Sequence, residues 1–160
     1  MNAKDAIRMS IDMGQMIATG YLEDLTDEEM MHRPHPGCNH IKWQVGHLIC
    51  SEHQMMEQAV PGAMPALPAG FDDRYTREQA SVDDPAKFDS REELLRVFHE
   101  QRAATLEALE TIDDAKLDHE TGISYAPTVA AAFEMQGSHW LMHAGQWAVI
   151  RRQLGRKPLY

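Results

Sequence analysis

The stretch GSHWLMHAGQW, residues 137–147, places two histidines four residues apart in a segment with helical character. Positions i and i+4 lie on one face of a helix, about one turn apart, so His139 and His143 can direct ring nitrogens at one point. This spacing is typical of an inward-facing seam, and we expect the pair to point into the core. The same row contains Ala132, Gln136, Gln146 and Ile150.

Four segments have the apolar spacing of long helices. They cover about residues 3–22, about residues 40–60, a stretch that begins at the capping sequence SREE (90–93), and a stretch from 127 or 128 to about 154. In the first segment, Met9, Met13 and Met16 are expected to widen the apolar stripe. In the third, Ser90 is the expected cap and Glu93 its capping-box partner.

The connections between these segments differ greatly in length. HRPHPGCN, residues 32–39, excludes helix through its prolines and glycine, and Asn39 is then expected to cap the second helix. Residues 61–89 carry four prolines, and an irregular connection of this length often lies over a site or crosses the end of a bundle. No segment predicts a strand. The sequence therefore predicts one all-α domain over residues 1–160, a four-helix bundle with a long crossover connection between helices 2 and 3.

The charge balance and composition exclude several classes of partner. The formal net charge is −10, which argues against binding nucleic acid, because that needs a basic surface. No apolar run approaches the roughly 20 residues that cross a bilayer, so no membrane partner is expected. The N-terminal residues resemble neither a secretory signal nor a transit peptide. Only two cysteines are present, and reduced thiols in a cytoplasmic protein are the expected state.

The histidine pair is compatible with a metal site, but by itself it is weak evidence, and two hydrogen-bonded structural histidines are the alternative. Buried imidazoles without partners are unfavourable, and a divalent metal such as Zn, Ni or Fe is one solution. Two ligands rarely suffice, and among nine histidines His47, inside WQVGHLI, is the best placed third ligand. Its neighbour Gly46 would allow a close approach of another chain segment or a ligand. Cys50, one turn later, can also ligate, but a small buried apolar residue is its more common role.

Two longer motifs resemble a known family. LTDEEMMHRPHPGCNHIKWQVGHLICSE (25–52) together with HWLMHAGQWAVIRRQLG (139–155) is similar to the DinB-like, or DinB/YfiT, superfamily of metalloenzymes. The resemblance implies a four-helix bundle, often a homodimer, with a three-histidine site for a divalent metal. Carried over by position, the GHL histidine is His47, and the H-x-x-x-H pair is His139 and His143.

The resemblance also implies classes of function. Relatives include transferases and isomerases that use a low-molecular-weight thiol, and hydrolases. Three histidine ligands leave a coordination position open, which is the catalytic pattern. We therefore expect an enzyme that acts on a small molecule by thiol transfer or hydrolysis with Zn, Ni, Fe or Mn. The alternative is a non-catalytic, stress-related binding module. Glu52, His53, Glu134 and Tyr125 are near enough in sequence to supply an acid or base, but the sequence assigns none of them.

Overall fold

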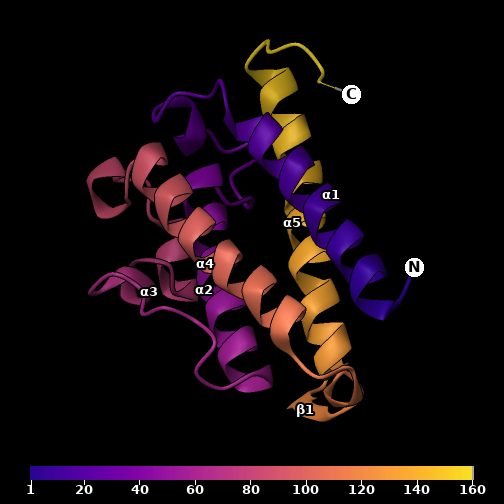
Figure 1. Ribbon diagram of the computed structural model, residues 1–160. Helices are drawn as coiled ribbons and strands as arrows, with labels where there is room; N and C mark the ends of the chain where they lie inside the picture. Colours follow the sequence, from indigo (N-terminus) through magenta and orange to yellow (C-terminus); the bar gives the residue numbers. More distant parts are fainter. Residues whose placement is uncertain (160) are drawn as a thin grey trace.

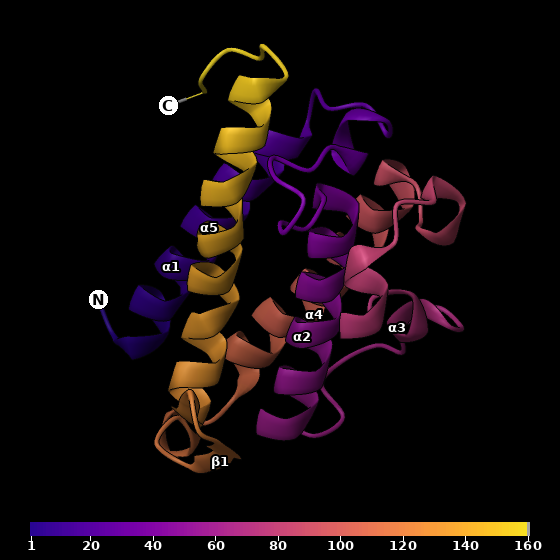
Figure 2. The same cartoon turned by 180° about the vertical axis from the view of Figure 1, so that it is seen from behind.

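The computed structural model describes residues 1–159 and is mostly helical, which confirms the predicted helical class. The four long helices are α1 (Ala3–Leu22), α2 (Ile41–Ala59), α4 (Arg91–Thr111) and α5 (Val129–Gln153) (Figure 1). Their bounds lie close to the predicted ranges. The long helices pack along one another, with α1 against α5 and α2 against both α4 and α5 (Figure 2).

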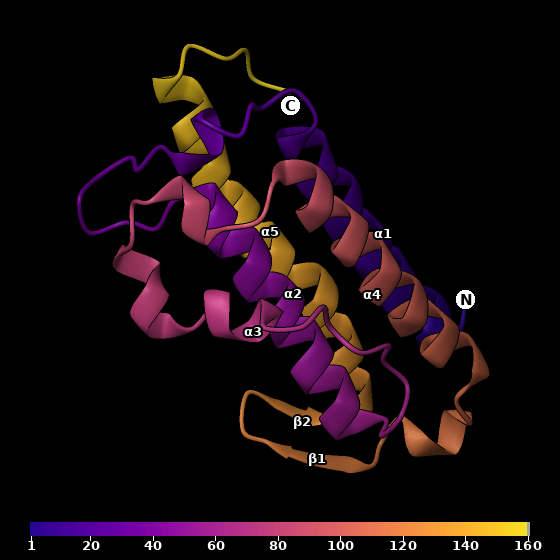
Figure 3. The ribbon, with the colours of Figure 1, turned by 90° about the vertical axis from the view of Figure 1, so that its left-hand side faces the viewer.

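The direction of the helices follows from the lengths of their connections. In Figure 3, α1 and α5 run toward the same end of the molecule, whereas α2 and α4 both run toward the opposite end. The connection between α2 and α4 travels back along the side of α2. It contains the short helix α3 (Phe71–Arg74) and two 3₁₀ helices, Arg77–Ser81 and Pro85–Lys87.

Short elements fill the remaining connections. Two further 3₁₀ helices cover Glu29–Met31 and Asp114–Lys116. The expectation of no strand is wrong: β1 (Glu120–Ile123) and β2 (Ala126–Thr128) pair antiparallel before α5. With four and three residues, these strands are too short to display the alternating pattern that reveals a strand in sequence.

Side-chain caps explain where three of the long helices begin. Asn2, Ser90 and Thr128 each accept a hydrogen bond from the backbone N–H three residues later. The prediction that Glu93 completes a capping box is wrong. Its carboxylate instead forms an ion pair with Arg96, three residues later, at 2.7 Å.

One face of α1 departs from the sequence analysis. Met9, Met13 and Met16 were expected to widen the apolar stripe, but these side chains are 63%, 49% and 51% exposed. The buried residues of α1 are Ile7, Ile11, Gly14, Ala18 and Leu22. The methionines lie on the opposite side of the helix, since positions two residues away are turned by about 200°.

Two glycines let α1 and α5 come into backbone contact. A Cβ on Gly14 would lie 2.5 Å from the carbonyl oxygen of Gly137, and a Cβ on Gly137 would lie 2.4 Å from that of Ser10. No carbon atom is tolerated at such distances, so the separation of these helices depends on the missing side chains.

Replacing Gly14 or Gly137 by alanine is expected to lower the free energy of unfolding by about 1–3 kcal/mol, because the methyl group must push the helices apart. Gly145→Ala is the matched control in α5, since a Cβ there meets nothing within 4 Å. That control is expected to gain up to about 1 kcal/mol in helix propensity. Urea unfolding followed by circular dichroism measures the free energy of unfolding of the three variants. Equal stability of the Gly137 and Gly145 variants would contradict the close approach of α1 and α5.

A histidine caps α2, one residue later than predicted. The Nδ1 atom of His40, not Asn39, accepts a hydrogen bond from the N–H of Trp43 at 3.1 Å. Its Nε2 atom lies 3.2 Å from the carbonyl oxygen of Val82. The ring is fully buried, and this burial, followed by the charge of Arg33, lowers the pKa of His40 to about 4. A proton on Nδ1 would therefore remove the cap.

The metal-free protein is expected to lose stability as the pH falls from 7 to about 4. Below the ordinary histidine pKa of 6.5 the unfolded chain binds a proton at His40, whereas the folded chain does so only near pH 4. His40→Asn keeps a capping acceptor without a titrating ring, and should reduce this loss by on the order of 2 kcal/mol at the acid end. Urea unfolding at a series of pH values measures it. An unchanged pH profile in the variant would contradict the assignment.

Candidate metal centre

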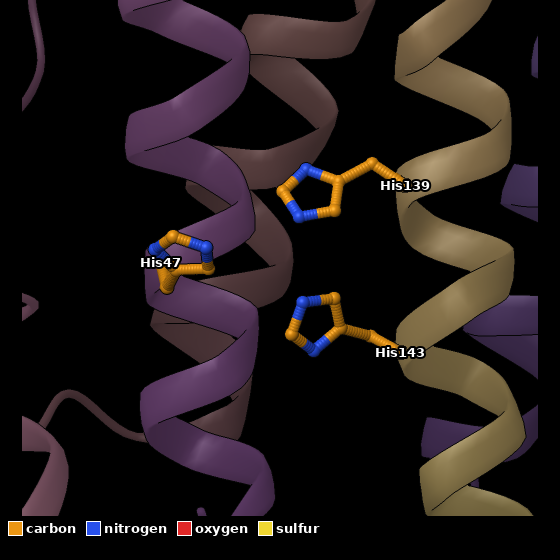
Figure 4. Close-up of side chains that lie close together, drawn as sticks. All are labelled: His47, His139 and His143. Carbon is orange, nitrogen blue, oxygen red and sulfur yellow. The ribbon is translucent and has the colours of Figure 1, made fainter. Parts of the chain in front are cut away.

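The structure brings together the three histidines that the sequence singled out. His47 comes from α2, and His139 and His143 come from successive turns of α5 (Figure 4). One ring nitrogen from each histidine lies within 4.8 Å of the other two. In Figure 4, the rings of His139 and His143 point from α5 toward His47. The cluster therefore has the donor set and spacing to hold one metal ion.

The pair on α5 lies at the edge of the buried stripe of that helix. His143 is buried and His139 is half-buried. The predicted inward positions Ala132, Gln136 and Ile150 are all buried. Gln146, predicted on the same row, is exposed. Three residues advance a helix by about 300°, so Gln146 is turned about 60° from His143, toward solvent.

His47 is held from the other side by an aromatic neighbour. The ring of Trp43, one turn earlier on α2, stacks on the imidazole with centroids 5.0 Å apart and planes only 3° from parallel. Trp43 in turn donates its indole N–H to the carbonyl oxygen of Thr76 at 2.9 Å. The stacking fixes the plane of the His47 ring.

All three imidazoles are held in the neutral state that metal ligation requires. Burial lowers the pKa of His139 to about 4 and that of His143 to about 3, and the neighbouring imidazoles add to both effects. The pKa of His47 is also lowered, first by burial and then by the charge of Arg77. Neutral imidazole is the form with a free lone pair for a metal.

Gln44 determines which nitrogen of His143 carries the proton. Its side-chain N–H donates to the carbonyl oxygen of Asn39 at 2.7 Å, and its Oε1 accepts from the indole N–H of Trp147 at 2.9 Å. Because an indole is only a donor, the amide orientation is settled. Oε1 also lies 2.8 Å from Nδ1 of His143, so Nδ1 must be the donor and Nε2 keeps its lone pair.

A buried ion pair lies beside the cluster and joins three helices. Arg102 of α4 makes two hydrogen bonds of 2.8 Å to the carboxylate of Glu52 on α2, and a third, of 2.9 Å, to the carbonyl oxygen of Gln136 on α5. Thr105 also donates to Glu52 at 2.8 Å. Glu52 is fully buried and engaged by this pair. It is therefore a structural residue, and the interpretation of Glu52 as a base is not supported.

The other candidates from the sequence fall into two groups. His53 is hydrogen-bonded to Gln101 at 3.0 Å, and Glu134 is an exposed residue that accepts from Ser10. Cys50 is free and buried outside the cluster, where burial raises the pKa of its thiol to about 12. Tyr125 differs, because it is 67% exposed at the tip of the β1–β2 hairpin and faces the site.

A cleft opens onto the histidines. Its volume is about 750 Å³, within the range of small-molecule sites. His47 and His143 lie in its wall with residues of α2 and of the connection between α2 and α4. A smaller pocket of about 330 Å³ is lined by His47 and His139, and Tyr125 borders both pockets. The long irregular connection does lie over a site, as its length indicated.

The fold and the site define a helical protein with a three-histidine cluster that can hold a metal ion. A family description agrees: the sequence matches the DinB superfamily over residues 11–147. The chain belongs to this superfamily, which confirms the resemblance drawn from its motifs.

One solved structure supports the fold independently. A conserved protein from Enterococcus faecalis superposes with a TM-score of 0.71, covering 98% of this chain and 99% of the other. The two sequences are 16% identical, so this likeness concerns the fold alone. A search among curated proteins finds no match.

Gln44→Leu is expected to weaken metal affinity by about 10- to 100-fold, because His143 loses the acceptor that sets its tautomer and orientation. Competition with a chromophoric chelator measures the affinity. Gln54→Leu is the matched control, since Gln54 is an exposed residue of α2 that lines the same cleft. Circular dichroism of both variants reports whether the fold is kept. Equal metal affinity in a folded Gln44 variant would refute its role.

Proposed function

We propose that this protein is a metal-dependent enzyme that acts on a small molecule by thiol transfer or hydrolysis. One observation carries the proposal: three neutral imidazoles converge at the wall of an open cleft. A divalent metal bound there would act as a Lewis acid and would activate a water molecule or a thiolate at neutral pH. Zn, Ni, Fe and Mn all remain candidates for this metal, and a low-molecular-weight thiol remains the candidate co-substrate.

The residues of the chain have separate tasks in this proposal. His47, His139 and His143 would hold the metal. Gln44 keeps the lone pair of His143 on Nε2, and Trp43 keeps the His47 ring in its plane. Tyr125 borders both openings, where its phenol can meet a bound substrate.

The shape of the site favours catalysis over the alternative of a non-catalytic binding module. In residues 1–159 the cluster of metal-ligating side chains contains three histidines and no fourth member. A fourth protein ligand would close the coordination sphere, as in structural metal sites. Three ligands beside a cleft of this volume leave room for a substrate.

We also propose that the four long helices form a four-helix bundle with a crossover between α2 and α4. The contacts among α1, α2, α4 and α5 support it, as does the shared direction of α2 and α4 in Figure 3. The connection of residues 60–90 is long enough to return along the whole of α2.

A homodimer, a cytoplasmic location and the absence of membrane and nucleic-acid partners stay predictions. Residues 1–159 contain no helix with the length and apolarity needed to cross a bilayer. A homodimer interface could use the exposed apolar side chains of α1 and α5. These are Met9, Met13 and Met16 of α1, and Met142 and Val149 of α5. Cytoplasmic location and the absence of nucleic-acid partners follow from composition alone.

Untagged protein is expected to contain about one divalent ion per chain, and His139→Ala is expected to lose it while keeping its helical content. Elemental analysis measures the ion. Because a ligand of the native state raises stability, chelator should lower the Tm of the wild type and leave that of the variant unchanged. His119→Ala, an exposed histidine, is the matched control.

Activity is then followed in the loaded protein with p-nitrophenyl acetate for hydrolysis and with cysteine plus an electrophile for thiol transfer. Turnover that disappears with chelator and in His139→Ala supports the proposal. Full metal occupancy in His139→Ala would overturn the ligand set. A loaded protein with no turnover in either assay would favour the binding module.

A further inference from the structure

One wall of the cleft, formed by the connection between α2 and α4, is pinned to α2 by two contacts. The ring of Tyr75 lies on Gly46, where a Cβ would come within 2.1 Å of the ring. The indole N–H of Trp43 donates a hydrogen bond to the carbonyl oxygen of Thr76 at 2.9 Å. This pinned segment, residues 71–77, lines the cleft through Asp72, Asp73, Tyr75, Thr76 and Arg77. Its charged side chains are therefore carried by an anchored backbone in the wall of the cleft that His47 and His143 also line.

Arg77 is an exposed cation on this wall, and its charge acts on the neighbouring carboxylate of Glu78. The neighbouring Arg74 pairs with Asp89 at 2.9 Å, but Arg77 forms no ion pair among residues 1–159. Its charge reaches the metal centre, since it contributes to the lowered pKa of His47. In a chain with a net charge of −10, an unpaired guanidinium beside a cleft is a local attraction for an anionic group. Guanidinium matches carboxylate geometry through two parallel hydrogen bonds.

Asp72 and Asp73 supply the opposite charge at the other end of the pinned segment. Both are exposed, line the cleft and lack an ion pair within the described chain. The charge of Asp72 acts on the thiol of Cys50, which lies one turn after His47 on α2. The wall thus presents a cation and two anions, separated by the Tyr75–Thr76 anchor, to the same cleft.

We propose that the substrate of this site is a small zwitterion of the amino-acid type, whose carboxylate pairs with Arg77 and whose ammonium group pairs with Asp72 and Asp73. Its third functional group, a thiol in the thiol-transfer form of the proposed function, then faces His47, His139 and His143. This inference rests on the proposed function, because it needs a metal at the three histidines. Charges of both signs on one wall select against ligands that carry only one.

The test uses protein loaded with Co²⁺ and three thiols that differ in charge. Cysteine carries both groups, N-acetylcysteine lacks the ammonium group, and cysteamine lacks the carboxylate. Titration of the thiolate–cobalt absorption band gives a Kd for each. Every affinity is compared with that of the wild type for the same thiol, so that differences in thiol acidity cancel, as in a double-mutant cycle.

Arg77→Gln is expected to weaken the binding of cysteine and of N-acetylcysteine by about five- to tenfold. The Kd of cysteamine should stay unchanged. The double variant Asp72→Asn, Asp73→Asn is expected to weaken the binding of cysteine and of cysteamine by a similar factor. The Kd of N-acetylcysteine should stay unchanged. Arg152→Gln is the matched control, since Arg152 is exposed near the end of α5 and lies outside the cleft. It should change no affinity.

The outcomes separate this inference from the proposed function. Thiols that bind the cobalt equally well in wild type and variants would overturn the zwitterion inference and leave the metal centre in place. Cobalt that binds but shows no thiolate band with any of the three would overturn both the inference and thiol transfer. A chain that binds no cobalt would overturn the proposed function itself.

Discussion

The buried ion pair between Glu52 and Arg102 sets the relative positions of the three helices around the site. Arg102 binds the carboxylate on α2 and a backbone carbonyl on α5 at the same time. Burying both charges is unfavourable unless their geometry is complete, so a small shift of either helix would leave a charge unpaired. His47 lies five residues before Glu52, and His139 three residues after Gln136. The spacing of the imidazoles is therefore tied to the geometry of this pair.

The histidine cluster and the cleft depend on the same segment of α2. Trp43, Gln44, Gly46 and His47 are nearly consecutive, yet each faces a different partner. Trp43 stacks on His47 and holds the cleft wall, Gln44 reaches across to α5, and Gly46 makes room for Tyr75. One turn of helix thus carries His47, orients His143 and supports a wall of the cleft. This concentration explains how one helical segment orders both the histidine cluster and the long connection that lines the cleft.

Sequence reasoning identified the helices and the histidines because both are local properties. Apolar periodicity and capping residues lie within a few positions of one another, and the i, i+4 pair shares a face wherever α5 is placed. Three of the wrong predictions illustrate equally physical causes. His40 replaces Asn39 as cap because an imidazole nitrogen is also an acceptor, Gln146 turns outward at the edge of its stripe, and the hairpin strands are too short to show a period. The roles of Gln44 and of the Trp43 indole N–H were missed because their partners, His143, Trp147 and Thr76, are remote in sequence.

The sequence by itself determined the mostly helical class, the approximate bounds of four long helices and the three histidines. These follow from residue types at fixed short separations and, for His47, from family motifs. Only the tertiary structure decided that the histidines meet, which nitrogen of His143 is free, and that Arg77 and Asp72 face the same cleft. The reason is that these features depend on the distance between helices. That distance results from the Gly14–Gly137 contact, the Glu52–Arg102 pair and the Gln44 bridge, which join residues far apart in the chain.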